Sequence, residues 1–316
     1  KPILLEHFPY EAAIRNRLLM SRKDAKAIGL LHFELGELFA GAVEAIQKKL
    51  SARGGDEPIE FVAIKGFPDI HIPRRGANPV SGSLELGEPA FTACRMKVPV
   101  VSDFPSKDMA LGGQGGPIFS YADHVLFARK DRTVVVLHLG ALATFTVLPP
   151  QLDQVISFDA APCNLALDGA IRIITSGNRD RDVDGKTAAS GVVIDEFLEY
   201  LMEHPYFGRV PPKSISREEF APEVYLRDAL MGRRDYSLED LMATVTAAVA
   251  NVIIRAYSRF IATQYEVARI ILTGGGAYNL FLVSLLRKGI AGPVFRLSDE
   301  YGLPCSLVDP VRVAVL

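Results

Sequence analysis

The sequence predicts an α/β protein of two domains with a cleft between them. Its 316 residues exceed the length at which one hydrophobic core usually stops growing, so two domains of roughly 150 residues are expected. Short β-rich segments alternate with segments of helical periodicity along the chain. Near the C-terminus a glycine triplet follows a strand-like segment and precedes a helical one, an arrangement that often holds nucleotides.

The first domain is expected to span residues 1–130. Apolar residues recur every three or four positions from 24 to 49, which predicts one long helix, and two lysines at its end suit the negative helix terminus. Residues 60–64 and 98–102 are short β-rich segments, separated by a stretch rich in glycine and proline. Strand and helix signals therefore alternate in this half of the chain.

The second domain is expected to span residues 131–316. Residues 133–138 and 144–148 have the composition of two strands joined by a tight turn, and this new β-structure marks the start of the domain. Ser237 stands three residues before Asp240, ahead of a long apolar periodic run, which predicts a helix opened by a capping box.

Composition excludes several classes of partner. Lysine and arginine residues together number 35, against 37 aspartate and glutamate residues. The chain therefore lacks the basic excess of nucleic-acid-binding proteins, and no nucleic-acid partner is expected. No stretch approaches the ~20 apolar residues of a membrane span, so no membrane association is expected. The cysteines Cys94, Cys163 and Cys305 form no CxxC pair, which favours a reducing, cytoplasmic location. No two histidines lie four residues apart, and no metal site is predicted.

Gly274, Gly275 and Gly276 are candidates for a nucleotide-binding turn. They lack Cβ atoms, which lets a ligand approach the backbone, and the helix that follows directs its first N–H groups at negative charge. Asn279 adds a polar side chain to the same turn. The alternative is a tight strand-to-helix connection that binds nothing.

A second glycine cluster occupies residues 112–117 and follows Asp103. Its flexible backbone and the amide of Gln114, flanked by Gly113 and Gly115, favour a polar sugar or phosphate site. The alternative is a flexible hinge between domains.

Asp159 follows the β-rich residues 155–158. Open α/β sheets gather their ligands at the ends of such strands, so this carboxylate is a candidate catalytic group. The alternative is a solvated loop aspartate.

Taken in order, these motifs resemble the anhydro-N-acetylmuramic acid kinase family, including its levoglucosan kinase branch. The resemblance runs along nearly the whole chain and includes GGQGGP at 112–117, TGGGAYN at 273–279 and DEYGLP at 299–304. Further family-like segments lie at residues 36–43, 102–104, 184–191, 205–214 and 217–218.

The resemblance implies the two-domain actin-like ATPase fold of sugar kinases, Hsp70 and actin, closing over ATP and a 1,6-anhydrosugar. It implies that a carboxylate activates water while the γ-phosphate of ATP moves to the 6-hydroxyl, with Mg²⁺ accompanying the ATP. Asp159 takes the place of the general base in the family's FDTGPGN segment, and Asp309 that of a further acidic residue.

Other site residues follow from the same resemblance. The nucleotide side is expected to include Gly140, Gly274, Gly275, Gly276, Asn279 and Lys213. The substrate side is expected to include Asp103, Gly113, Gln114 and Gly115.

Several family motifs differ in this chain. Ala161 and Cys163 replace two glycines of FDTGPGN, HLGA replaces NIGG at 138–141, and the SHGQT motif does not follow Ile64. The chain starts about where the strand after the family's MSGTSxDG phosphate loop should run, so we expect either an incomplete chain or the loss of that loop.

Two interpretations of these differences are open. One is an active kinase with ATP and an anhydrosugar as small-molecule partners. The other is a catalytically inactive protein of the same fold that serves as a binding or regulatory module. A homodimer or another protein partner is compatible with both.

Overall fold

The computed structural model describes residues 2–20, 24–54, 58–74, 81–216, 218–233 and 235–316, so Arg217 of the family-like segments lies outside the described residues. The chain forms two compact units, the first comprising residues up to 118 together with 313–316, and the second residues 119–312. The second unit begins before residue 131, because helix α5 (Ser120–Phe127) packs on the strands that follow it.

The first unit is built on the long helix α2 (Ala25–Ala52), which confirms the helix predicted from residue 24. The helix begins where it does because Asp24 caps it: its Oδ1 accepts a hydrogen bond from the backbone N–H of Ala27 at 2.7 Å. Leu31 and Leu35 of α2 are buried with Leu86 and with residues of α1 (Ala12–Leu19).

Short strands and helices complete this unit. Strands β2 (Phe67–Ile72) and β3 (Gly82–Leu86) form an antiparallel hairpin, and β1 (Val62–Ala63) pairs in parallel with β4 (Val100–Val101). Helix α3 (Pro89–Met96) packs on α2, and α4 (Phe104–Ala110) follows β4. A Cβ on Gly36 would lie 2.6 Å from the carbonyl oxygen of Glu88, so glycine allows the close approach of α2 to the start of α3.

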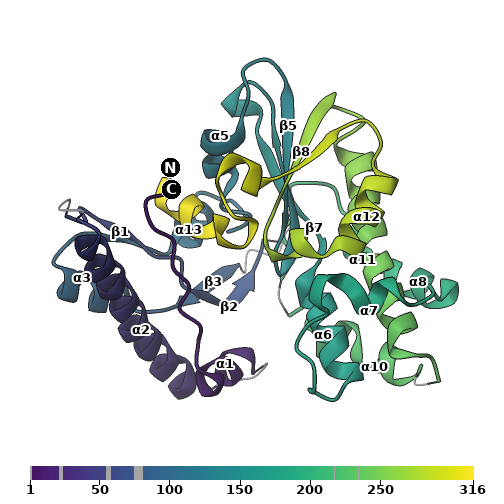
Figure 1. The fold of residues 1–316 in the computed structure, drawn as a ribbon, viewed down its shortest axis with the longest axis horizontal. Coiled ribbons are helices and arrows are strands. Elements are labelled where there is room, and N and C mark those ends of the chain that lie inside the picture. The colour runs from purple at the N-terminus through teal and green to yellow at the C-terminus, as the bar shows by residue number, and fades with distance from the viewer. Residues whose placement is uncertain (1, 21–23, 55–57, 75–80, 217, 234) are drawn as a thin grey trace. The chain divides into compact units, whose positions relative to one another are not determined.

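The second unit contains a five-stranded sheet in the order β7-β6-β5-β8-β9. Figure 1 labels its strands β5, β7 and β8. Its strands are β5 (Thr133–Leu139), β6 (Leu142–Leu148), β7 (Ile156–Pro162), β8 (Val267–Thr273) and β9 (Val294–Leu297). Strand β6 runs antiparallel to both neighbours, whereas β8 and β9 join in parallel. The predicted β5–β6 hairpin is therefore confirmed.

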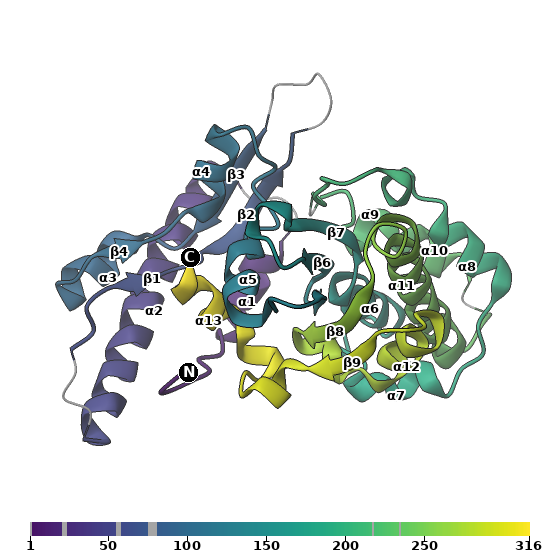
Figure 2. The same ribbon diagram turned by 90° about the horizontal axis from the view of Figure 1, so that it is seen from above.

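Strict alternation along β5 gives the sheet two apolar faces. Val135, Leu137 and Leu139 point into the larger core, whereas Val134 and Val136 point into the smaller one. The larger core is covered by α6 (Asn164–Ile174), α8 (Asp195–Met202), α10 (Arg227–Met231), α11 (Leu238–Phe260) and α12 (Leu280–Gly289). The smaller core lies under α5 and the first turn of α13 (Val308–Val315), on the opposite side of the sheet (Figure 2).

Helix α11 is the central helix of the larger core. The Ser237 hydroxyl accepts from the Asp240 N–H at 3.0 Å, which confirms the predicted helix start. By length and composition α11 could also cross a membrane, but 78% of its apolar window is buried in the unit. Core packing therefore accounts for its apolar composition.

Candidate functional site

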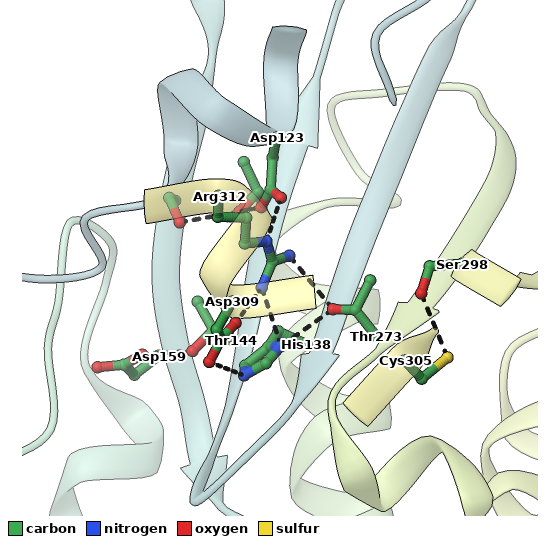
Figure 3. Close-up of polar contacts among 11 residues, drawn as sticks. Asp123, His138, Thr144, Asp159, Thr273, Ser298, Cys305, Asp309 and Arg312 are labelled. Carbon is green, nitrogen blue, oxygen red and sulfur yellow. Dashed lines mark hydrogen bonds and ion pairs between the residues drawn. The ribbon is translucent and has the colours of Figure 1, made fainter. Parts of the chain in front are cut away.

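A row of four polar side chains crosses the sheet on the face of the smaller core. Asp159 on β7, Thr144 on β6, His138 on β5 and Thr273 on β8 are register partners from strand to strand. Register partners point to the same face, so their side chains meet (Figure 3). Thr144 Oγ1 donates to Asp159 Oδ1 at 2.7 Å, and His138 Nδ1 lies 3.0 Å from Thr273 Oγ1.

Asp159 is 4% exposed, so the alternative of a solvated loop aspartate is wrong. Strand β7 continues past it to Pro162, so Asp159 lies within the strand rather than at its end. Its Oδ2 accepts from the Ser214 hydroxyl and the Ile215 N–H, both at 3.0 Å, in addition to the Thr144 bond on Oδ1. Three donors stabilise the ionised form of this carboxylate and fix its orientation.

Lys213 is buried beside this carboxylate, among aromatic rings. Its Nζ donates to the Tyr206 carbonyl oxygen at 3.4 Å and lies 4.6 Å from the Tyr206 ring centroid and 5.3 Å from that of Phe260. Burial lowers the pKa of Lys213 to about 8, although the charge of Asp159 opposes this shift. The structure thus places Lys213 in the core under β7.

Gly140 and Gly274 pack against each other where the β5–β6 turn meets the turn after β8. Gly274 has φ +83°, and a Cβ there would lie 2.6 Å from the Leu139 carbonyl oxygen and 3.0 Å from the Gly140 nitrogen. Positive φ and close backbone contact both require glycine at 274. A Cβ on Gly140 would lie 2.5 Å from His138 Nε2. The two turns are therefore in direct backbone contact.

Gly275, Gly276 and Asn279 lie on the wall of a pocket of about 380 Å³ within the second unit. Asn164, Asp168 and Arg181 line the same pocket. A Cβ on Gly275 would meet no atom within 4 Å, so its backbone borders open space. Asn279 Oδ1 accepts from the Leu282 N–H at 2.9 Å and so caps α12. The pocket has the size of a small-ligand site beside a helix N-terminus.

Asp168 is the most perturbed carboxyl of this pocket. Burial raises its pKa to about 6, against the opposing charges of Arg172 and Arg181. The pocket wall thus carries a carboxyl that titrates just below neutral pH.

Asp309 lies in the first turn of α13, 45% exposed, with its Oδ1 3.2 Å from Arg312 Nη1 and its Oδ2 3.9 Å from His138 Nε2. Arg312 itself is 1% exposed, and its Nε donates to Asp123 Oδ1 at 2.7 Å. Burial pushes the pKa of Asp123 upward, and Arg312 and the Thr146 hydroxyl pull it down. Sequence reasoning missed this pair, although a single arginine in the apolar segment 308–316 was a usable signal.

The expected substrate residues lie in the first unit. Asp103 has φ +56° and lines a pocket of about 340 Å³ together with Ser102, Glu85 and Glu88. Burial raises the pKa of Glu85, and the negative charge of Asp103 adds to the shift. The pocket is polar and has room for a small sugar.

The glycine cluster at 112–117 folds around Asp108. The Gly115 N–H donates to Asp108 Oδ2 at 2.8 Å, and the Gly113 N–H donates to the Asp108 carbonyl oxygen at 2.9 Å. A Cβ on Gly113 would lie 2.1 Å from Asp108 Oδ2, so this loop itself requires glycine there. Gln114 stands half-buried between the two glycines, and none of the three lines the Asp103 pocket.

Neither position at which the family has glycine shows a positive φ here. Cys163 precedes α6 with φ −110° and ψ −102°, and Ala161 lies in β7. Both side chains are fully buried, and burial raises the pKa of Cys163 to about 12. A side chain at these two positions is therefore compatible with the observed fold.

The second unit is an α/β domain whose mixed sheet carries two glycine turns in backbone contact. The model of the family "Anhydro-N-acetylmuramic acid kinase" matches residues 2–316, and the chain belongs to this family. It is 34% identical over 310 residues to an anhydro-N-acetylmuramic acid kinase of Bacillus cereus, covering 97% of this chain and 80% of the relative.

Two further similarities were found. A Caldanaerobacter subterraneus subsp. tengcongensis protein of the same name is 33% identical over 324 residues, covering 98% of this chain and 81% of the relative. Among solved structures, a ROK family glucokinase from Streptomyces griseus in complex with glucose and AMPPNP is 12% identical with a TM-score of 0.36, covering 87% of this chain and 86% of that one.

Proposed function

We propose that this chain is an anhydrosugar kinase that couples ATP use to hydrolytic phosphorylation of a 1,6-anhydrosugar of the anhydro-N-acetylmuramic acid or levoglucosan type. Membership of the family supports the reaction class. The observation that carries the proposal is the buried Asp159 carboxylate, held by three donors on a strand of the sheet that also bears the paired glycine turns.

Asp159 is proposed as the general base. In the reaction the bond between C1 and the bridging oxygen breaks, a water oxygen bonds to C1, and the freed 6-oxygen takes the γ-phosphoryl group. A base that removes the water proton must be ionised and fixed in place, and the Thr144, Ser214 and Ile215 donors favour both conditions. Asp309 is proposed as a second acidic group near the glycine turns, through its contact with His138.

ATP is proposed to bind in the second unit, with its phosphates at Gly140, Gly275 and Gly276 and its nucleoside in the pocket lined by Asn164 and Asn279. The open space at Gly275 and the shape of the two glycine turns fit a phosphate chain close to the backbone. Mg²⁺ would neutralise phosphate charge and accompany the nucleotide. Lys213 supports Asp159 from the core in this proposal.

The sugar is proposed to contact the first unit at Asp103 and at the Gly113, Gln114 and Gly115 loop. Asp103 borders a polar pocket, and Gln114 offers an amide that can donate and accept hydrogen bonds. A cytoplasmic location is proposed with this function, since ATP is its phosphoryl donor. The predicted cleft between the two units remains a prediction.

The test is ADP release coupled to a spectroscopic assay, with levoglucosan and anhydro-N-acetylmuramic acid as separate substrates. We expect turnover with one of them, a 6-phosphorylated product by mass spectrometry, and one labelled oxygen at C1 in isotopically labelled water. The Asp159→Asn protein is the matched control, and its kcat should fall by about 1,000-fold or more. A folded parent chain that releases no ADP with either sugar would instead support the inactive interpretation.

A further inference from the structure

His138 carries a lone pair on Nδ1. Arg312 Nη1 lies 2.9 Å from this nitrogen, and a guanidinium can only donate hydrogen bonds. Nδ1 must therefore accept, which leaves the proton of a neutral imidazole on Nε2. Thr273 Oγ1 lies 3.0 Å from Nδ1 and accepts a hydrogen bond from Arg312 Nη2 at 3.2 Å. The hydroxyl hydrogen of Thr273 can therefore be donated to the same His138 nitrogen.

The guanidinium that sets this tautomer is itself fixed. Arg312 Nε donates to Asp123 Oδ1 at 2.7 Å, and both side chains are about 1% exposed. Thr146 donates to the other Asp123 oxygen at 3.0 Å, and the Phe119 ring lies 5.3 Å from the guanidinium carbon. A protonated Nδ1 would face this immobile cation at hydrogen-bond distance, so the neutral form is favoured.

The Nε2 side of His138 faces the glycine turns. Nε2 is 3.9 Å from Asp309 Oδ2, and a Cβ on Gly140 would lie 2.5 Å from it. Gly140 in turn packs on Gly274. The hydrogen on Nε2 therefore lies at the turn proposed above to hold phosphate.

We propose that Asp123 and Arg312 are positioning residues that hold His138 as the Nε2–H tautomer, so that the β5–β6 turn presents a hydrogen-bond donor to a phosphoryl oxygen of the nucleotide. The role at phosphate rests on the proposed function, whereas the tautomer does not. A lone pair at the same place would repel the negatively charged phosphoryl oxygens. An imidazolium would pair with the Asp309 carboxylate but would be repelled by the Arg312 guanidinium, which itself pairs with Asp123.

The first test is ¹H–¹⁵N NMR of the full chain with ¹⁵N-labelled histidine and no nucleotide. His138→Asn identifies the His138 signals by their disappearance. We expect the neutral Nε2–H pattern at neutral pH, and a shift of the Nε2 proton when a non-hydrolysable ATP analogue with Mg²⁺ is added. An Nδ1–H pattern or an imidazolium would overturn the tautomer. An Nε2 proton that stays unmoved while other signals report bound analogue would overturn the phosphate contact, whereas an analogue that shifts no signal would contradict the proposed nucleotide site instead.

The second test replaces the charges together. Asp123→Asn/Arg312→Met removes both, so no unpaired charge stays buried, and we expect a mixed His138 tautomer and a loss of kcat of about 10- to 100-fold. KM for the sugar should change less than about threefold, because the sugar is not touched. Arg312→Lys keeps the positive charge but loses the planar guanidinium that contacts Asp123 and His138 at once. This variant therefore provides the test if the double variant does not fold.

His138→Asn offers an amide donor and should keep more activity than His138→Leu. His124→Asn, on the helix that carries Asp123, is the histidine control and should keep parental kcat. A folded double variant with parental kcat and an unchanged His138 tautomer would overturn the positioning role.

Discussion

Thr144 and Asp159 are register partners on β6 and β7, and the Thr144 hydroxyl donates to Asp159 Oδ1 at 2.7 Å. The Asp159→Asn variant can keep this network: its amide oxygen can accept from Ser214 and Ile215 while its NH2 donates to a rotated Thr144 hydroxyl. We expect a stability loss of only about 1 kcal/mol but a kcat loss of about 1,000-fold or more. Thermal unfolding and coupled ADP release measure the two effects.

Thr144→Val is the matched control for that variant. It removes one donor but leaves the Asp159 charge, so kcat should fall less than about 10-fold. Equal losses in Asp159→Asn and Thr144→Val would contradict a role of Asp159 as base.

The glycine triplet offers two alanine variants with opposite expectations. Gly275→Ala adds a methyl group to open space without positive φ, so stability should change by less than about 0.5 kcal/mol while KM for ATP rises about 10-fold or more. Gly274→Ala forces a side chain into φ +83° and against the Leu139 carbonyl, so it should cost at least about 2 kcal/mol. Unfolding curves and ATP titrations distinguish the two variants. Unchanged ATP binding by Gly275→Ala would contradict the proposed position of the phosphates at Gly275.

Asp168 should make stability depend on pH in the acid range. Burial raises its pKa from 3.8 to about 6, so the folded state binds more protons than the unfolded state between these values, and stability falls as pH rises through them. Asp168→Asn has no titrating carboxyl at this position, so the parent should lose stability relative to the variant as pH rises between these two pKa values. Denaturant unfolding at several pH values checks the sign. A difference that is flat with pH would mean that Asp168 titrates normally.

Lys213 should make folding stability depend on pH in the opposite direction at alkaline pH. Its folded pKa of about 8 lies below the ordinary 10.5, so the unfolded state binds more protons between these values, and stability rises with pH there. Lys213→Met keeps the long apolar stem and removes the charge, so the parent should gain stability relative to it as pH increases. Measuring both proteins under identical denaturant conditions cancels the titrations that they share.

Breaking the buried Asp123–Arg312 pair should cost more than removing it. Arg312→Met alone leaves a buried carboxylate without its cation, and we expect a loss of about 3–5 kcal/mol. Asp123→Asn/Arg312→Met should lose clearly less, since no charge stays unpaired. A double variant as unstable as the single one would show that packing around Arg312, rather than its charge, dominates.

Local patterns predicted much of the fold. The long helix that begins after Asp24, the β5–β6 hairpin, the helix start at Ser237 and the strand, turn and helix around Gly274 all follow from spacing and residue type within short segments. The predicted Asp159 was misplaced at a strand end, because the alanines and proline after it gave no strand signal while pairing with β6 extended β7.

The sequence by itself determined the α/β alternation, the glycine turns and the family motifs, because each depends on residues close together in the chain. Only the tertiary structure decided the polar row across four strands, the aromatic surroundings of Lys213 and the contact of Asp123 with Arg312, which are 189 positions apart. Such contacts form when distant segments are packed and water is excluded, and no local pattern specifies which buried charges will then meet.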